Sequence, residues 1–209
     1  MPNSWFYRDD WHNKCLSIIA VNLNPDFMKK ILTITLFSTL ISANVFAQIY
    51  IGKTSEISFY SDGIIEDIEA KNTSTKPILN TANNEVLFKI SIQGFVFAKS
   101  LMQEHFNETY MESDKFPHAL FKGKINETID WKIDGTHKVT VTGKLTIHGI
   151  EKERTMDGTA TIKGGEITLE TKFNVAIKDH NITVPTIVVQ NIAEIVEVKI
   201  KALLFELKK

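Results

Sequence analysis

The sequence contains almost no cysteine: Cys15 is the only one among 209 residues. A disulfide framework is therefore excluded, and the fold must be held together by a hydrophobic core. No cysteine follows the apolar segment that begins near Met28. This absence excludes the lipid-modified N-terminal cysteine of a bacterial lipoprotein.

An excess of charge of one sign is also missing. The chain carries 24 Lys and Arg against 25 Asp and Glu, and both signs are mixed along it. A basic block that would indicate nucleic acid is absent, as is an acidic tail, so we expect no nucleic-acid partner. The sequence shows no internal repeat and no Pro- or Gly-rich linker long enough to divide it, which favours a single domain.

The motifs of catalytic and metal sites are absent as well. No GxSxG, P-loop, GxGxxG, HExxH, CxxC or EF-hand loop occurs. Glu104 and His105 are neighbours, but adjacent helix residues point about 100° apart, and no nucleophile is set beside them. Metal-ligand spacing is also missing among the later histidines, which are His105, His118, His137, His148 and His180. We expect no catalytic residue, no metal and no cofactor.

Residues 28–47 have the pattern of a signal peptide. Lys29 and Lys30 form a basic start, residues 31–41 form an apolar run, and Val45-Phe46-Ala47 fits a signal-peptidase site. The run is shorter than the ~20 residues that span a bilayer, so a membrane anchor is the weaker alternative. We predict cleavage after Ala47 and a periplasmic or secreted protein.

Residues 1–27 precede this signal, although a signal peptide should begin the chain. We interpret them as an over-extended gene start that is disordered or not translated, and we exclude them from the fold. The predicted folded domain is therefore residues 48–209.

Alternation of apolar and polar residues dominates this domain. It is clearest in residues 86–92, 119–125, 139–147, 167–177 and 196–204. Period-two alternation predicts strands with one buried face, and about eight such strands with short polar turns indicate an antiparallel β-barrel. An eight-stranded barrel is just wide enough to be filled by side chains or to hold one slim ligand.

One segment breaks the β pattern. Ser100 and Gln103 have the spacing of a capping box, and Pro117 disfavours a helical conformation at the residue before it. Between them, apolar residues and one histidine recur at helical spacing, namely Leu101, Met102, His105 and Phe106. We expect one short helix across a mouth of the barrel.

The same segment carries a family resemblance. SLMQEHFNETYMESDKFPHALFKGKI, followed by VTGKLTIHGIEKE and KFNVAIKDHNITVP, resembles the YceI family, in the form common in Bacteroidetes. The resemblance covers residues 48–209. It implies an all-β, lipocalin-like eight-stranded barrel with a short helix near its mouth. It also implies an exported carrier of an isoprenoid-type amphipathic lipid, not an enzyme, and it suggests dimers.

Whether the barrel is filled or hollow is not decided by the residues, because both cases demand apolar inward positions. The resemblance favours a hollow barrel with an isoprenoid or similar lipid as partner, exchanged through transient membrane contact. The candidate ligand-binding wall comprises Phe88, Ile90, Ile92, Phe95, Leu101, Met102, Phe106, Phe121, Leu145, Ile147, Phe173 and Val175.

Two other functions stay open. A filled barrel would suit an envelope stress or interaction protein with no small-molecule ligand, and it predicts an exposed apolar patch. An enzyme on the same scaffold predicts converging polar groups with perturbed pKa values inside the barrel.

Overall fold

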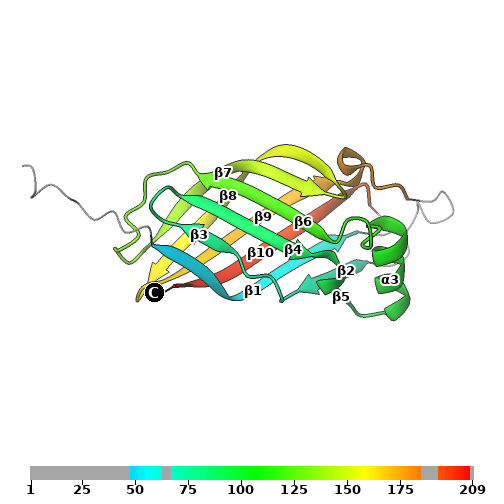
Figure 1. The fold of residues 1–209 in the computed structure, drawn as a ribbon, viewed down its shortest axis with the longest axis horizontal. Coiled ribbons are helices and arrows are strands. Elements are labelled where there is room, and N and C mark those ends of the chain that lie inside the picture. Colours follow the sequence, from blue (N-terminus) through cyan, green and yellow to red (C-terminus); the bar gives the residue numbers. More distant parts are fainter. Residues whose placement is uncertain (1–47, 63–66, 185–192, 208–209) are drawn as a thin grey trace, which may run out of the picture. The chain divides into compact units, whose positions relative to one another are not determined.

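The computed structural model describes residues 48–62, 67–184 and 193–207. The predicted gene extension (1–27) and the predicted signal peptide (28–47) lie outside the described residues. The described part of the chain folds as a β-barrel with a short helix at one end (Figure 1).

Eight antiparallel strands close the barrel, as predicted. Their order around it is β10-β9-β8-β7-β6-β4-β3-β1, and pairing of β10 with β1 completes the ring. Their bounds are β1 (Ile49–Ser61), β3 (Ile78–Asn80), β4 (Glu85–Ser91), β6 (His118–Ile125), β7 (Gly135–Ile147), β8 (Ile150–Lys163), β9 (Glu166–Ala176) and β10 (Ile195–Glu206). The fold class read from the alternation is confirmed.

Two further strands extend the sheet from β1. β2 (Ile68–Asn72) pairs with the second half of β1, and β5 (Val96–Phe97) pairs with β2. The fully buried side chain of Asn72 ends β2: its amide donates to the Ser91 carbonyl at 2.9 Å, and its oxygen accepts from the Ser74 amide at 2.9 Å. β3 and β5 are too short for periodicity to predict, which is why the sequence did not indicate them.

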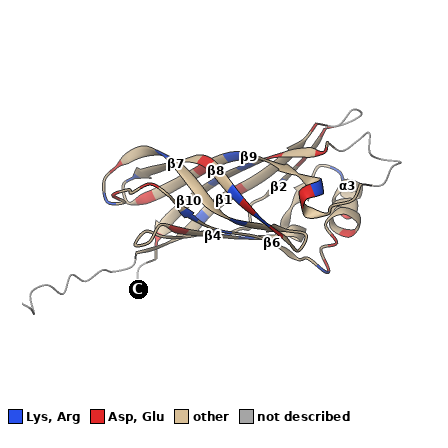
Figure 2. Ribbon diagram, turned by 90° about the horizontal axis from the view of Figure 1, so that it is seen from above, with Lys and Arg blue, Asp and Glu red and all other residues tan. Residues whose placement is uncertain are grey.

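The alternating apolar residues point inward, as expected. Phe88 on β4 pairs with Phe121 on β6, which pairs with Leu145 on β7, and all three are buried. A register slip of one residue would turn such a row toward water. Gly123 and Gly143 are paired where β6 and β7 approach closely, and a Cβ on Gly143 would lie 2.4 Å from the Lys122 carbonyl oxygen. Charged residues of both signs are spread along the strands (Figure 2).

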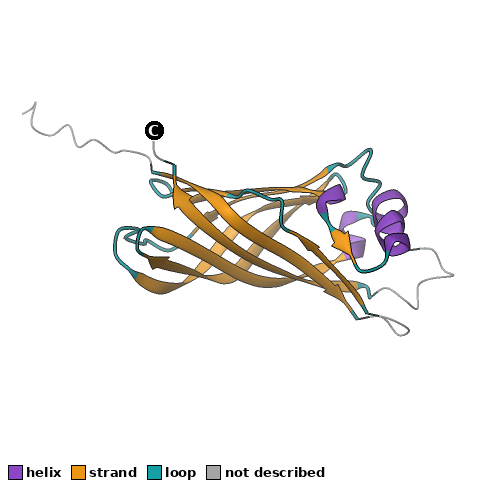
Figure 3. Cartoon of the chain, turned by 90° about the horizontal axis from the view of Figure 1, so that it is seen from below, coloured by secondary structure: helices purple, strands orange, loops and turns teal. Residues whose placement is uncertain are grey.

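The helix α3 (Ser100–His105) lies across one end of the barrel (Figure 3). It continues into a π-helical turn, Phe106–Tyr110, which is closed by a bond from the Met111 amide to the Phe106 carbonyl at 2.9 Å. The predicted capping box is wrong. Lys99 occupies the N-cap without a side-chain cap, and the Gln103 side chain accepts from the Phe97 amide at 3.3 Å.

Candidate functional site: an apolar cavity under the helix

The barrel contains a partly open cavity of about 350 Å³ on the helix side, and its wall reaches Val86 on β4 and Ile125 on β6. Seven of the eight barrel strands contribute to its wall, and α3 with its π-helical turn covers the end. The side chains on this wall are almost all aliphatic or aromatic. The apolar wall follows from the alternation of apolar and polar residues along the strands, because every second side chain of a strand points to the same face.

Eleven of the twelve predicted wall residues line this cavity. That they bind a ligand stays a prediction. They are Phe88, Ile90, Ile92, Phe95, Met102, Phe106, Phe121, Leu145, Ile147, Phe173 and Val175.

The assignment of Leu101 to the wall is corrected. Its side chain is 59% exposed and does not line the cavity. Met102 and Phe106 are four residues apart and share the inward face of the helix, whereas Leu101 is rotated by about 100° from Met102. The inward stripe of this short helix comprises Met102, His105 and Phe106, and apolar character alone did not show that Leu101 lies outside it.

Four phenylalanines form a cluster beneath the helix. The Phe106 ring stacks on Phe59 with centroids 5.4 Å apart, and it contacts Phe97 at 5.0 Å and Phe95 at 5.6 Å. The residues come from β1, β5, the link before β5 and the π-helical turn. The candidate list missed Phe59 and Phe97. The alternation from Ile57 to Ser61 would have indicated Phe59 as an inward residue.

The half of the barrel away from the helix is filled. Leu79, Ile162, Ile167 and Leu204 are each at most 2% exposed, and none of them lines the cavity. Trp131 lies in the same half, and its indole N–H donates to Asn84 Oδ1 at 2.9 Å. The interior is therefore neither wholly hollow nor wholly packed.

Few polar side chains reach the cavity. Ser61 Oγ accepts from the Ala193 amide at 2.9 Å, and Thr171 Oγ1 donates to the Asp157 carbonyl at 2.6 Å. Glu170 pairs with Lys201 at 2.8 Å. His105 and Tyr110 lie on the helix side, where partial burial raises the pKa of the Tyr110 hydroxyl. These two groups are available to a polar ligand atom.

Neither a metal centre nor a membrane-spanning helix is found in the described ranges. Within residues 48–62, 67–184 and 193–207, no three His, Cys, Asp or Glu side chains come together to hold a metal ion. Among the same residues, no helix is long and apolar enough to cross a bilayer.

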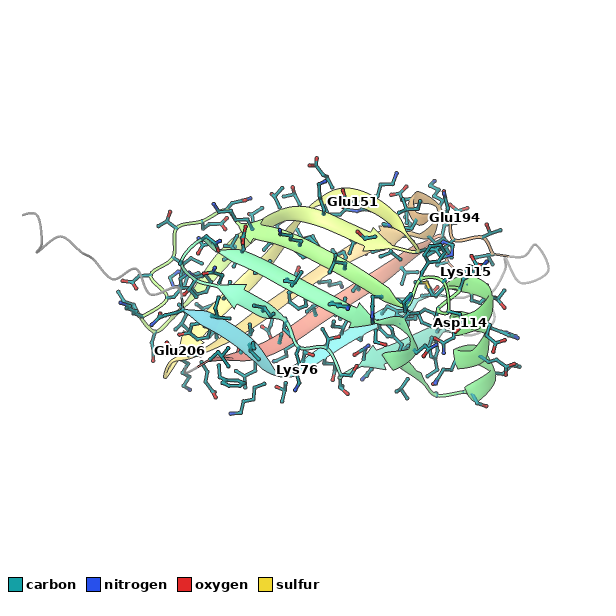
Figure 4. The ribbon with its side chains drawn as sticks, viewed as in Figure 1. Lys76, Asp114, Lys115, Glu151, Glu194 and Glu206 are labelled. Carbon is teal, nitrogen blue, oxygen red and sulfur yellow. The ribbon has the colours of Figure 1, made fainter. Side chains whose placement is uncertain are left out.

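A polar cluster joins three segments at the helix end of the barrel. Glu112 Oε2 lies 3.0 Å from His148 Nε2, and the other Glu112 oxygen pairs with Lys115, which lies beside the helix (Figure 4). His148 Nδ1 lies 3.2 Å from the His180 carbonyl oxygen, and His180 Nδ1 lies 3.1 Å from the Ile150 carbonyl oxygen. The cluster ties the segment after the helix to the β7–β8 turn and to the turn after β9.

Backbone strain marks the same cluster. Glu112, His148 and Asn181 have φ values of 41°, 50° and 54°, a region that side chains with a Cβ seldom adopt. Such conformations persist where the surroundings hold them in place. Here the ring of Phe116 packs on His148 with centroids 4.5 Å apart.

Comparison with known proteins bears on this barrel. A family model described as the YceI-like domain matches residues 48–204. No curated protein matches the chain.

Solved structures show the same fold. BcnA of Burkholderia cenocepacia is similar with a TM-score of 0.60 and 18% identity, over 71% of this chain and 95% of that one. A polyisoprenoid binding domain from Saccharophagus degradans is similar with a TM-score of 0.66 and 11% identity, over 77% and 99% of the two chains. At such identities the likeness concerns the fold alone.

Proposed function

Because the chain belongs to the YceI-like family, we propose that it binds an isoprenoid-type amphipathic lipid inside the barrel and sequesters or carries it without catalysis. The match of the YceI-like family model to residues 48–204 confirms the resemblance that the sequence motifs indicated. The single observation that carries the proposal is the apolar cavity of about 350 Å³ inside the barrel.

The physical basis of binding is burial of apolar surface. Moving such surface out of water contributes about 25 cal/mol per Å², without needing a directed contact. A prenyl chain lies against Phe88, Phe121, Leu145 and Phe173, and its polar end lies at the helix, near His105 and Tyr110. No step requires a nucleophile or a proton donor.

One similar structure supports this choice of ligand. The Saccharophagus degradans domain is a polyisoprenoid binding domain, and its fold covers 77% of this chain. We extend lipid binding to this chain on the family membership and the apolar cavity together.

The filled-barrel alternative is less well supported. It requires a packed interior, but only the half of the barrel away from the helix is packed. The enzyme alternative requires converging ionisable groups inside the barrel. On the cavity wall Glu170 is already paired with Lys201 and Thr171 is bonded to backbone, which leaves His105 and Tyr110 at the helix as the available ionisable groups.

Export, membrane contact and dimerisation belong to the proposal as well. The signal-like residues 28–47 support a periplasmic or secreted location. Val96 and Leu101 lie at the helix end and are 66% and 59% exposed, so they offer apolar contacts for lipid exchange at a membrane. A homodimer is suggested by the family alone.

The proposal is tested by extracting lipid from protein made in a bacterial host and by native mass spectrometry of the same preparation. A matched pair of variants on β6 provides the control, because Ala119 faces the cavity and its neighbour Leu120 faces out. Ala119→Trp is expected to lose the co-purified lipid, and Leu120→Trp is expected to keep it. Recovery of no lipid, together with no uptake of added farnesol, would contradict the proposal.

A further inference from the structure

We propose that the filled half of the barrel acts as a floor that limits the enclosed ligand to a prenyl chain of about three isoprene units. This inference rests on the proposed function, because it names the length of the lipid that the same cavity takes. The floor comprises Leu79, Ile162, Ile167 and Leu204.

Three of the four floor residues lie side by side on neighbouring strands. Ile162 on β8 pairs with Ile167 on β9, and Ile167 pairs with Leu204 on β10. Leu79 adds to the layer from β3, where it pairs with Tyr50 and Val86. All four floor side chains are at most 2% exposed, so almost no space wide enough for a water molecule borders them.

The cavity ends directly above this layer. Its wall reaches Val139 on β7, Gly158 on β8 and Leu169 on β9. The next inward positions on β8 and β9 are Ala160 and Ile167, which are fully buried and are not part of the wall. A ligand that enters under the helix therefore stops at the floor, which begins at Ile167 on β9 and at Leu79, the partner of the wall residue Val86, on β3.

Hydrogen bonds join two loops at the end of the barrel opposite the helix. Trp131 is 6% exposed, and its indole N–H donates to Asn84 Oδ1 at 2.9 Å. The Asn84 amide in turn donates to the Glu127 carbonyl at 2.9 Å. These bonds tie the β3–β4 turn to the segment after β6, and this closes the end of the barrel opposite the helix.

The volume of the cavity sets the length of the prenyl chain that it can hold. An apolar cavity of about 150 Å³ takes up one benzene molecule, so the same filling of 350 Å³ gives room for about 14 carbon atoms. Three isoprene units have close to that number. A longer prenyl chain leaves its remainder outside the barrel, where burial adds nothing to its affinity.

A length series tests the floor. Geraniol, farnesol and geranylgeraniol carry two, three and four isoprene units, and each displaces a fluorescent apolar dye from delipidated protein. Affinity is expected to rise at least about tenfold from geraniol to farnesol, and less than about threefold from farnesol to geranylgeraniol, because only buried carbons contribute. A further tenfold rise at geranylgeraniol overturns the inference and leaves lipid binding intact. Failure of all three alcohols to bind overturns the proposed function and the inference with it.

Two substitutions change the longest prenyl chain that the cavity can hold, one raising this length and the other lowering it. Ile167→Ala lowers the floor, and geranylgeraniol is then expected to bind at least about tenfold more tightly than farnesol. Val139→Phe fills the lower end of the cavity, and farnesol is then expected to lose its advantage over geraniol. Leu120→Ala, on the outside of β6, should leave the series unchanged. If Ile167→Ala fails to fold, Val139→Phe still tests the inference. Unchanged relative affinities for the three alcohols in Val139→Phe would contradict the claim that the floor limits the chain length.

Discussion

His148 and Glu112 connect two segments that are 36 residues apart: the β7–β8 turn and the segment that follows the helix, with Nε2 and Oε2 3.0 Å apart. The second ring nitrogen of His148 faces the His180 carbonyl oxygen at 3.2 Å. Both ring nitrogens of His148 therefore have an oxygen atom within hydrogen-bonding distance. This contact holds the segment after the helix against the barrel and so positions the cover of the cavity.

The Glu112 contact predicts a pH dependence of stability. Lys115 first and His148 second lower the pKa of the Glu112 carboxyl from its ordinary 4.5. The stabilisation is therefore full above pH 4.5 and is lost as the pH falls through the lowered value. Urea unfolding of the protein and of Glu112→Gln should differ at neutral pH and converge in acid. A difference that stays constant down to pH 3 would contradict this account.

His180 predicts a second acid effect. Burial, opposed by the Ile150 carbonyl, lowers the pKa of this fully buried ring below its ordinary 6.5. The unfolded chain takes up a proton first, so stability falls as the pH drops below 6.5 toward the lowered value. An NMR titration should find more than half of the His180 rings neutral at pH 6.5. A midpoint at or above 6.5 would show that the ring is not buried as described.

Phe106 predicts a joint loss of binding and stability. Its ring contacts Phe59, Phe95 and Phe97 and also lines the cavity. Phe106→Ala should destabilise the fold by about 2–3 kcal/mol, somewhat less than for a fully buried ring, and should weaken farnesol binding at least about tenfold. Leu101→Ala is the matched control on the exposed face of α3. Equal effects of the two substitutions would contradict the assigned faces.

Trp131 separates stability from binding. Trp131→Phe keeps most of the packing and removes the donor to Asn84 Oδ1. An unpaired polar group in this partly buried site costs about 1–3 kcal/mol. Thermal unfolding should show this loss, whereas farnesol affinity should stay within about twofold, because Trp131 does not line the cavity. A large loss of affinity without a loss of stability would place Trp131 in the binding site.

The strand faces were predictable because period-two alternation is a direct consequence of strand geometry. The rows from Val86 to Ile92 and from Ala119 to Ile125 are buried as the alternation requires. The depth of the cavity was not predictable in the same way. Leu145, which lines the cavity, and Leu204, which fills the floor, have the same pattern in the sequence, and only the packing across strands separates them.

The helix shows the same limit at a smaller scale. Helical spacing placed Met102 and Phe106 inward correctly, but it also placed Leu101 there, because a single turn of helix gives too few residues to define a narrow stripe. The cluster of Glu112, His148 and His180 has no signal in the sequence. Its members lie far apart along the chain, and only the closure of the barrel brings them together.

Isotope-edited NMR of the protein with bound farnesol tests the central claim most directly, because it detects which methyl groups lie against the prenyl chain. The account predicts nuclear Overhauser effects from the chain to Leu145, Ile147 and Val175 on the cavity wall, and none to Leu204 below the floor. Contacts confined to outward residues such as Leu120, or the absence of any contact, would contradict the claim that the hollow half of this barrel encloses the lipid.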